Sequence, residues 1–378
     1  MTANPISEAT LVVGHSTVPE ARAPHRWIVG ETFDFFLVCG GAVWVLLALN
    51  YVFLGWVVPS SATQGPIVGQ WLMILILIGQ HVSADAHNAA TYMRIYGSDE
   101  DQKRFRFYGK WLALACIPIF FIGISTPVLG SAMLYCYLIT VFWHYAAQAF
   151  GIALIYCYKQ DYKMTHLERE TFRWFILSMS AFIAVRMLTY KEYAPGYFFG
   201  VTLPFWGPLP EWLFKSVAVV FIGSSIAFGI TLLKKLVLER KIMPWPALLC
   251  ISTLMLLGFA KGIYSLLAWF YVPVFFHGSQ YLAVCLSYYL KERGIPQGMI
   301  ASQIGRMLLQ PSALKYMVTV IFVGAFFYIA IPHFFQSIGF DYSLVAAVVL
   351  ATVNFHHFNT DAAIWRLRDP RCREFLLA

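Results

Sequence analysis

Charged side chains are scarce in this chain, at 12% of its 378 residues, whereas soluble domains carry about 25%. Hydrophobic residues make up 59%, and apolar runs of about 20 residues, long enough to cross a bilayer, recur along the whole length. The scarcity of charge excludes an ordinary soluble domain. The net charge of +8 does not indicate nucleic-acid binding, because basic residues of multispan proteins concentrate in cytoplasmic loops.

Several motif classes are also missing. The seven cysteines are scattered and form no CxxC pair, which argues against a disulfide scaffold and against a zinc ribbon. No Walker motif, GxGxxG fingerprint or internal repeat is visible. The N-terminal segment is polar and lacks the apolar core of a signal peptide. We therefore expect residues 1–33 to form a flexible cytoplasmic arm.

The apolar segments predict an all-α integral membrane protein with about ten transmembrane helices in one bundle. The bundle would occupy residues 34–368 and leave a short basic cytoplasmic tail at 369–378. The expected spans are 34–57, 66–96, 110–126, 127–157, 172–190, 211–238, 243–262, 264–292, 314–335 and 339–367.

Loop charges predict the orientation of these spans. The connections after the even-numbered spans, and the C-terminal tail, are rich in Lys and Arg, whereas SSATQGP, STPVLG and SIGFDYS contain neither. The positive-inside rule then puts both termini in the cytoplasm. We expect a multi-pass protein of the cytoplasmic (inner) membrane.

One histidine lies in each of four separate apolar segments. A histidine there is costly to bury and is a functional residue by default, and imidazole is the commonest protein ligand for transition metals. All four segments are even-numbered spans, and their basic ends place the histidines in the cytoplasmic half of the membrane or near its middle. A shared metal centre is therefore predicted. The four residues are His87, His144, His277 and His357.

Polar residues stand one helical turn after several histidines, on the same helix face. A metal-bound imidazole normally donates its other N–H to a carboxylate or a carbonyl. Asp85 and Asp361 are thus candidates to orient ligands, to carry protons or to bind metal themselves, while Gln148 and Tyr281 suit supporting contacts. The i,i+4 pairs are His144 and Gln148, His277 and Tyr281, His357 and Asp361, and His81 and Asp85.

The number of metal ions stays open. Four histidines alone suit one non-haem iron, and four further residues raise the potential ligands to eight, enough for two irons. Adjacent His356 and His357 point about 100° apart on a helix, so one site seldom takes both. The four further residues are His81, Asp85, His356 and Asp361.

The segments AHNAATYMRIY, WHYAAQAFGIALIY, FHGSQYLAVCLSY and HHFNTDAAIWR resemble those of a family of bacterial multispan membrane proteins with an HHxxxDxxIW-like motif near the C-terminus. That resemblance brings no activity with it. It adds Thr91, Arg94 and Trp365 to the candidate site residues. The expected cofactor contacts are Gln148, Arg94 and Thr91. Asp85, Asp361 and Tyr281 are the expected catalytic residues.

A looser similarity is to histidine-rich membrane oxygenases. Fatty-acid desaturases and hydroxylases carry HxxxH and HxxHH boxes around two irons, and this chain has none of those boxes intact. The β-carotene-cleaving oxygenases of the Brp/Blh type spread single histidines over several helices, and this pattern is closer to theirs. The analogy supports an expectation of oxygenase function, but function has to be argued from the residues of a site.

We therefore expect a membrane-embedded non-haem iron enzyme, of oxygenase or desaturase class, that acts on a lipophilic substrate such as a fatty-acyl or isoprenoid chain. A redox partner would dock on the cytoplasmic side. One alternative is a haem-binding protein with two axial histidines, and another is a transporter with a His/Asp proton relay. A non-catalytic assembly factor is a further alternative.

Overall fold

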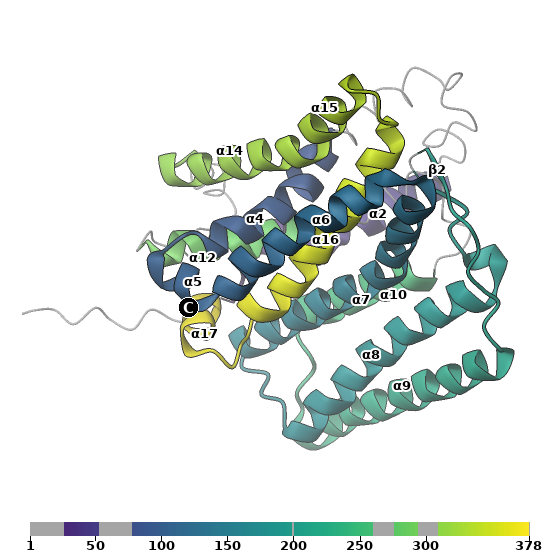
Figure 1. Ribbon diagram of the computed structural model, residues 1–378. Helices are drawn as coiled ribbons and strands as arrows, with labels where there is room; N and C mark the ends of the chain where they lie inside the picture. The colour runs from purple at the N-terminus through teal and green to yellow at the C-terminus, as the bar shows by residue number, and fades with distance from the viewer. Residues whose placement is uncertain (1–25, 53–77, 199, 260–275, 294–308, 378) are drawn as a thin grey trace, which may run out of the picture.

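The computed structural model describes residues 26–52, 78–198, 200–259, 276–293 and 309–377. Within these residues the regular structure is almost entirely helical (Figure 1), as the sequence predicts, apart from one antiparallel hairpin in which Tyr197–Phe198 (β1) pairs with Val201–Thr202 (β2). The helices are α1 (Glu31–Phe33), η1 (Asp34–Val38), α2 (Gly41–Val52), η2 (Gln80–Asp85), α4 (Ala86–Ile95), α5 (Asp99–Arg104), η3 (Phe107–Leu112), α6 (Ala113–Ser125), α7 (Pro127–Lys159), α8 (His166–Thr189), η4 (Lys191–Tyr193), α9 (Glu211–Glu239), α10 (Trp245–Phe259), α12 (Ser279–Glu292), α14 (Pro311–Ala325), η7 (Phe326–Ala330), α15 (Ile331–Ser337), α16 (Tyr342–Ile364) and α17 (Pro370–Leu377).

Five helices among the described residues are long and apolar enough to cross a membrane, and each overlaps one predicted span. They are Phe107–Ser125, Pro127–Lys159, His166–Thr189, Glu211–Glu239 and Pro311–Ser337. The predicted spans 34–57, 66–96, 243–262 and 264–292 lie partly outside the described residues. α16 covers most of 339–367, and its second half carries two histidines, two asparagines and an aspartate, which lower its apolarity.

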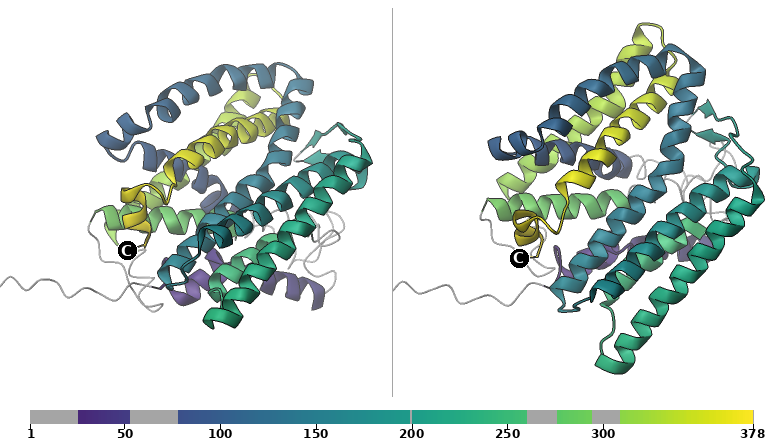
Figure 2. Two further views of the ribbon diagram at one scale, coloured as in Figure 1. Left: turned by 90° about the horizontal axis from the view of Figure 1, so that it is seen from below. Right: turned by 60° about the horizontal axis from the view of Figure 1, so that its bottom comes forward.

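Four helices contain or directly follow the four histidines that the sequence predicts to converge, and they run in the same general direction through the molecule (Figures 1 and 2). These are α4, α7, α12 and α16. α7 begins after Thr126, whose side chain accepts the Leu129 N–H, and it continues for 33 residues. α16 packs against α4, α6 and α7, and α12 packs against α4. The pair α8 and α9 lies outside α7 (Figure 2), and α9 buries only Phe228 and Lys235.

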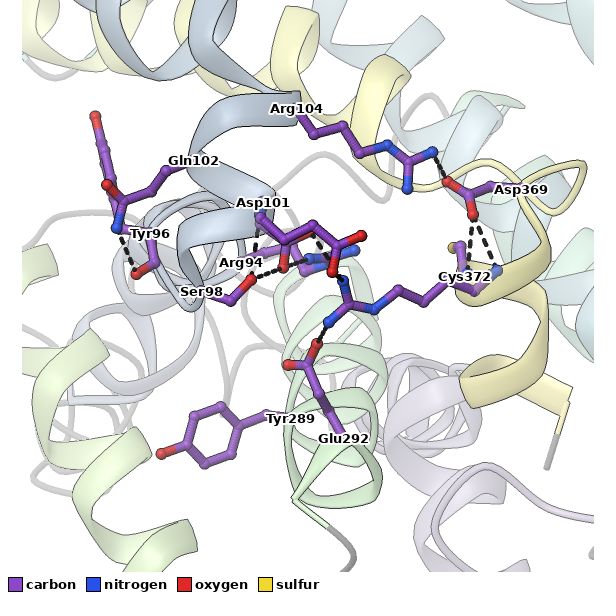
Figure 3. Close-up of polar contacts among 12 residues, drawn as sticks. Arg94, Tyr96, Ser98, Asp101, Gln102, Arg104, Tyr289, Glu292, Asp369 and Cys372 are labelled. Atoms are coloured by element: carbon purple, nitrogen blue, oxygen red, sulfur yellow. Dashed lines mark hydrogen bonds and ion pairs between the residues drawn. The ribbon is translucent and has the colours of Figure 1, made fainter.

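Charged residues tie the C-terminal ends of these helices together (Figure 3). Arg94, at the end of α4, contacts Asp101 of α5 at 2.5 Å, and both side chains are buried. Arg371 of α17 contacts Glu100 at 2.7 Å and Glu292 of α12 at 2.6 Å. The network therefore fixes the ends of α4 and α12 against the short helices α5 and α17.

Parts of the predicted N-terminal arm and of the predicted basic tail lie among the described residues and pack against the core of the bundle. Residues 1–25 lie outside the described residues, but Ile28 and Val29 are buried, and their N–H groups and that of Gly30 donate to the carboxylate of Asp34. In the tail, Pro370–Leu377 forms α17, which packs against α7 and α12. The described part of each segment buries apolar side chains of its own, among them Ile28 and Leu376.

The buried ion pair yields the first prediction. Arg94→Met removes the nearer of the two cations that face the buried carboxylate of Asp101 and leaves Arg371, 3.9 Å from its Oδ1, so we expect the free energy of unfolding to fall by about 3 kcal/mol. Arg368→Met is the control, because Arg368 is exposed. Thermal unfolding in detergent measures both variants, and equal stability of the two would contradict the structural role given to Arg94.

Candidate metal centre

Four imidazole rings meet inside the bundle. Each of the four histidines predicted from the sequence is at most 4% exposed. Ring centroids are 4.8 Å apart for His87 and His277, 4.7 Å for His277 and His144, 4.8 Å for His144 and His357, and 4.8 Å for His357 and His87. His277 and His357 lie across from each other at 6.5 Å. We call this ring the four-histidine cluster.

The dimensions of the cluster match four ligands around one ion. A metal–nitrogen bond of about 2.1 Å puts an imidazole centroid about 3.2 Å from the metal. Rings at the corners of a square are then about 4.5 Å from their neighbours and about 6.4 Å from the ring across, whereas a tetrahedron makes every separation about 5.2 Å. The observed sides and diagonal are close to the square, a geometry in which a metal takes further ligands above or below the plane of the ring.

Ring nitrogens inside the cluster lack hydrogen-bond partners. The Nδ1 of His87 contacts the Ala84 carbonyl, so its N–H donates there and its buried Nε2, which has no partner, keeps the lone pair. Both ring nitrogens of His277 are buried without partners among the described residues. Unpaired buried polar atoms are costly and rare. A cation at the centre would satisfy the Nε2 of His87 and one nitrogen of His277.

A hydrogen-bond network orients His357. Its Nδ1 lies 2.7 Å from Thr91 Oγ1, which is 2.8 Å from the Tyr281 hydroxyl. Tyr281 donates to Asp361 Oδ1 at 2.6 Å and accepts from Trp365 Nε1 at 3.0 Å. If the His357 Nδ1–H donates to Thr91, its Nε2 lone pair faces the cluster. A metal-bound imidazole normally donates its other ring N–H to such a hydrogen-bond acceptor, which fixes its tautomer and its orientation.

Asp361 presents its second oxygen to the cluster. Its Oδ2 lies 3.4 Å from His357 Nε2 and 4.0 Å from His144 Nε2. Those two ring nitrogens face each other at 3.1 Å, close to the separation of about 3.0 Å expected for neighbouring nitrogens on one metal. The donor atoms form two overlapping sets that could hold a metal, His87 with His277 and His357, and His144 with His357 and Asp361.

Two cluster histidines are positioned by π-helical turns. His277 lies in such a turn at residues 276–278, and His87 follows directly after η2. A π turn inserts a residue into a helix and is frequent at functional sites. Gln148 fixes the turn at His277, because its Nε2 donates to the His277 carbonyl and to Gln280 Oε1, both at 3.0 Å. Gln148 therefore positions a ligand through the backbone.

Two of the predicted site residues, His81 and Asp85, lie elsewhere. They form their own pair at 2.5 Å between His81 Nδ1 and Asp85 Oδ2, and Gln80 donates to the other carboxylate oxygen. Neither residue belongs to the two donor sets that converge among the described residues. The pair lies in the π-helical turn η2, which directly precedes α4.

Two further predictions need correction. His356 contacts the Tyr108 carbonyl through Nε2 at 2.9 Å and stacks on Tyr92, so it is no ligand of the cluster. Arg94 is engaged by Asp101 and by the Tyr288 ring, 4.5 Å from its guanidinium carbon, so it contacts no cofactor position. Both residues serve helix packing.

Other supporting residues escaped the sequence analysis. The Phe358 ring stacks on His144 with centroids 4.1 Å apart. Asn88 and Asn354 both donate to the Tyr328 hydroxyl, at 2.6 and 3.3 Å, and so join α4, η7 and α16 behind the cluster. The two asparagines lie close to histidines in the sequence, and this proximity could have marked them as supporting residues. Phe358 is an apolar residue in an apolar segment, so nothing in the sequence distinguishes it.

A pocket of about 180 Å³ lies beside the cluster, between α7, α12, α16 and α17. His144, Gln148, Tyr281 and Asp361 form the polar part of its wall, and the remaining wall is mostly apolar. The cluster is therefore accessible to a ligand from one side.

Comparisons of the chain with family models, with curated proteins and with solved structures find no match. The site is interpreted from its own geometry.

The cluster predicts metal binding that depends on each imidazole. We expect the wild-type protein to co-purify with a metal in mild detergent and His144→Ala and His277→Ala to lose it, because each removes one of four converging nitrogens. His166→Ala is the control, since His166 is exposed at the start of α8. Elemental analysis of the three variants is the measurement. Unchanged metal content in both cluster variants would rule out this centre.

The support of His357 makes a separate prediction. Thr91→Val keeps the side-chain shape but removes the hydroxyl that contacts His357, Tyr281 and Asp361. We expect metal affinity to fall by about 10- to 100-fold, measured by competition with a chelator. Thr140→Val is the control, because that hydroxyl donates only to backbone carbonyls of its own helix. Equal affinities would show that Thr91 does not orient the ligand.

Proposed function

We propose that the protein is a multi-pass enzyme of the bacterial inner membrane, with about ten spans and cytoplasmic termini, in which the four-histidine cluster holds one non-haem iron. The observation that carries this proposal is the ring of buried imidazoles with unpaired nitrogens. The reaction class we propose is oxygen-dependent oxidation of a lipophilic substrate, by an oxygenase or a desaturase reaction.

The donor set favours one metal ion. His81 and His356 make other contacts, which leaves the cluster and Asp361 as the donors. The near-square ring argues against a tetrahedral zinc site. Imidazoles with a carboxylate suit iron, and the metal's ligand positions above and below the plane of the ring would take Asp361 and a small molecule. Bound iron(II) would supply the binding and activation of dioxygen.

Haem is disfavoured by the same distances. A porphyrin held by two axial histidines fills the plane between them. His277 and His357 have the longest separation measured in the cluster, 6.5 Å, but His87 and His144 are each within 4.8 Å of both. Their rings occupy the space that the macrocycle would need.

The chain's own residues have defined tasks in the proposed reaction. Asp361 holds or releases a proton at Oδ2 while Tyr281 and Thr91 keep its Oδ1 hydrogen-bonded. Phe358 and the apolar pocket wall exclude water around His144. An apolar pocket supports a hydrocarbon substrate more than the ion path of a relay transporter. The charged surface around Arg371 is a suitable place for a cytoplasmic redox partner.

Labelled oxygen tests the reaction class. Membranes that contain the wild-type protein, loaded with iron(II) and supplied with an electron donor for the two electrons that either reaction takes up, are incubated with ¹⁸O₂, and extracted lipids are analysed by mass spectrometry. We expect lipid products that carry ¹⁸O or have lost two hydrogens, and neither under argon nor with His144→Ala. Identical lipid profiles in all samples would contradict an oxygen-dependent function.

A further inference from the structure

The pocket beside the cluster is elongated along the helices. On α7 its wall extends from Trp143 to Ile155, which lies twelve positions further along the chain and about 18 Å further along the helix. Phe358 lines it on α16, and Leu376 of α17 lines it near the charged end of the bundle. His144 and Asp361 therefore open into a long, narrow space, whose shape fits a linear chain better than a fused ring system.

The pocket borders the surface of the bundle. Trp143 is 43% exposed, and Ala147 and Ala362 are exposed as well, although all three line the pocket. A Cβ added at Gly151 would meet no atom within 4 Å. Small residues on one face of α7 thus leave an opening between α7 and α16, on helices whose exposed faces would contact lipid.

Positive charge stands at the end of the pocket nearest α17. Leu367 lines the pocket and is flanked in the chain by the exposed Arg366 and Arg368. The Nε of Arg366 donates to the carbonyl of Ala362, another lining residue, at 2.9 Å. The guanidinium is therefore held at the rim. A guanidinium at the membrane interface pairs well with a carboxylate.

We propose that the pocket binds the hydrocarbon chain of a long-chain fatty acid, which enters from the bilayer between α7 and α16. Its carboxylate pairs with Arg366, assisted by Arg368, and its internal carbons lie beside His144 and Asp361. The assignment of this chain as substrate rests on the function proposed above, whereas its binding does not require a metal. A neutral isoprenoid would use the same apolar wall without needing the arginines.

The test uses cis-parinaric acid, a fluorescent long-chain fatty acid, and its uncharged methyl ester. Energy transfer from tryptophan reports binding to the full-length protein in detergent, because Trp143 and Trp365 line the pocket. We expect saturable binding of the acid that is lost in Gly151→Phe. Gly223→Phe is the matched control, because a Cβ at this exposed glycine of α9 also meets nothing within 4 Å.

Removing the charge of Arg366 tests whether it pairs with the carboxylate of the fatty acid. We expect Arg366→Gln to weaken binding of the acid by about tenfold and to leave the ester unaffected, while the exposed Arg373→Gln changes neither. Binding by Gly151→Phe equal to wild type would overturn the pocket assignment. Equal affinities for acid and ester in every variant would overturn the fatty acid in favour of a neutral hydrocarbon.

Metal content is measured in the same samples. Probe binding by a protein that holds no iron would contradict the proposed enzyme but would support the pocket. Iron retained in Gly151→Phe together with lost probe binding would support both.

Discussion

The burial of four imidazoles with unpaired nitrogens is the constraint on which the rest of the structure depends. The rings of the four-histidine cluster lie 4.7–4.8 Å from their neighbours in the ring, and three nitrogens, on His87 and His277, have no partner among the described residues. An apolar bundle does not tolerate such atoms without compensation. A bound cation explains why the helices converge where they do.

The surroundings of the cluster are built to hold it rigid. On one side, Thr91, Tyr281, Asp361 and Trp365 form a connected set of hydrogen bonds behind His357. At the ends of the same helices, buried and half-buried ion pairs such as that of Arg94 fix their relative positions. Tyr281, Asp361 and Trp365 also line the pocket, whose remaining wall is mostly apolar. The rigid polar side of the site therefore borders the space that admits a hydrocarbon.

The sequence predicted the helical class and the convergence of the four histidines, because loop charges orient the spans and the distance to a basic end gives depth. It could not predict which faces of the helices meet. His356 and His81 are residues of the type and spacing of ligands, but His356 contacts the carbonyl of Tyr108, and His81 pairs with Asp85 of its own helix. The π-helical turn at His277 also changes the register of a helix face in a way that spacing does not reveal.

X-ray absorption at the iron edge tests the central claim most directly. For the purified, iron-loaded protein, the account predicts nitrogen and oxygen neighbours at about 2.1 Å, with the outer-shell pattern of several imidazoles and with no sulfur or porphyrin contribution. The imidazole pattern should weaken in His277→Ala that has been loaded with excess iron. Failure of the wild-type protein to retain iron, or a spectrum with no imidazole pattern, would contradict the assignment of the cluster as an iron centre.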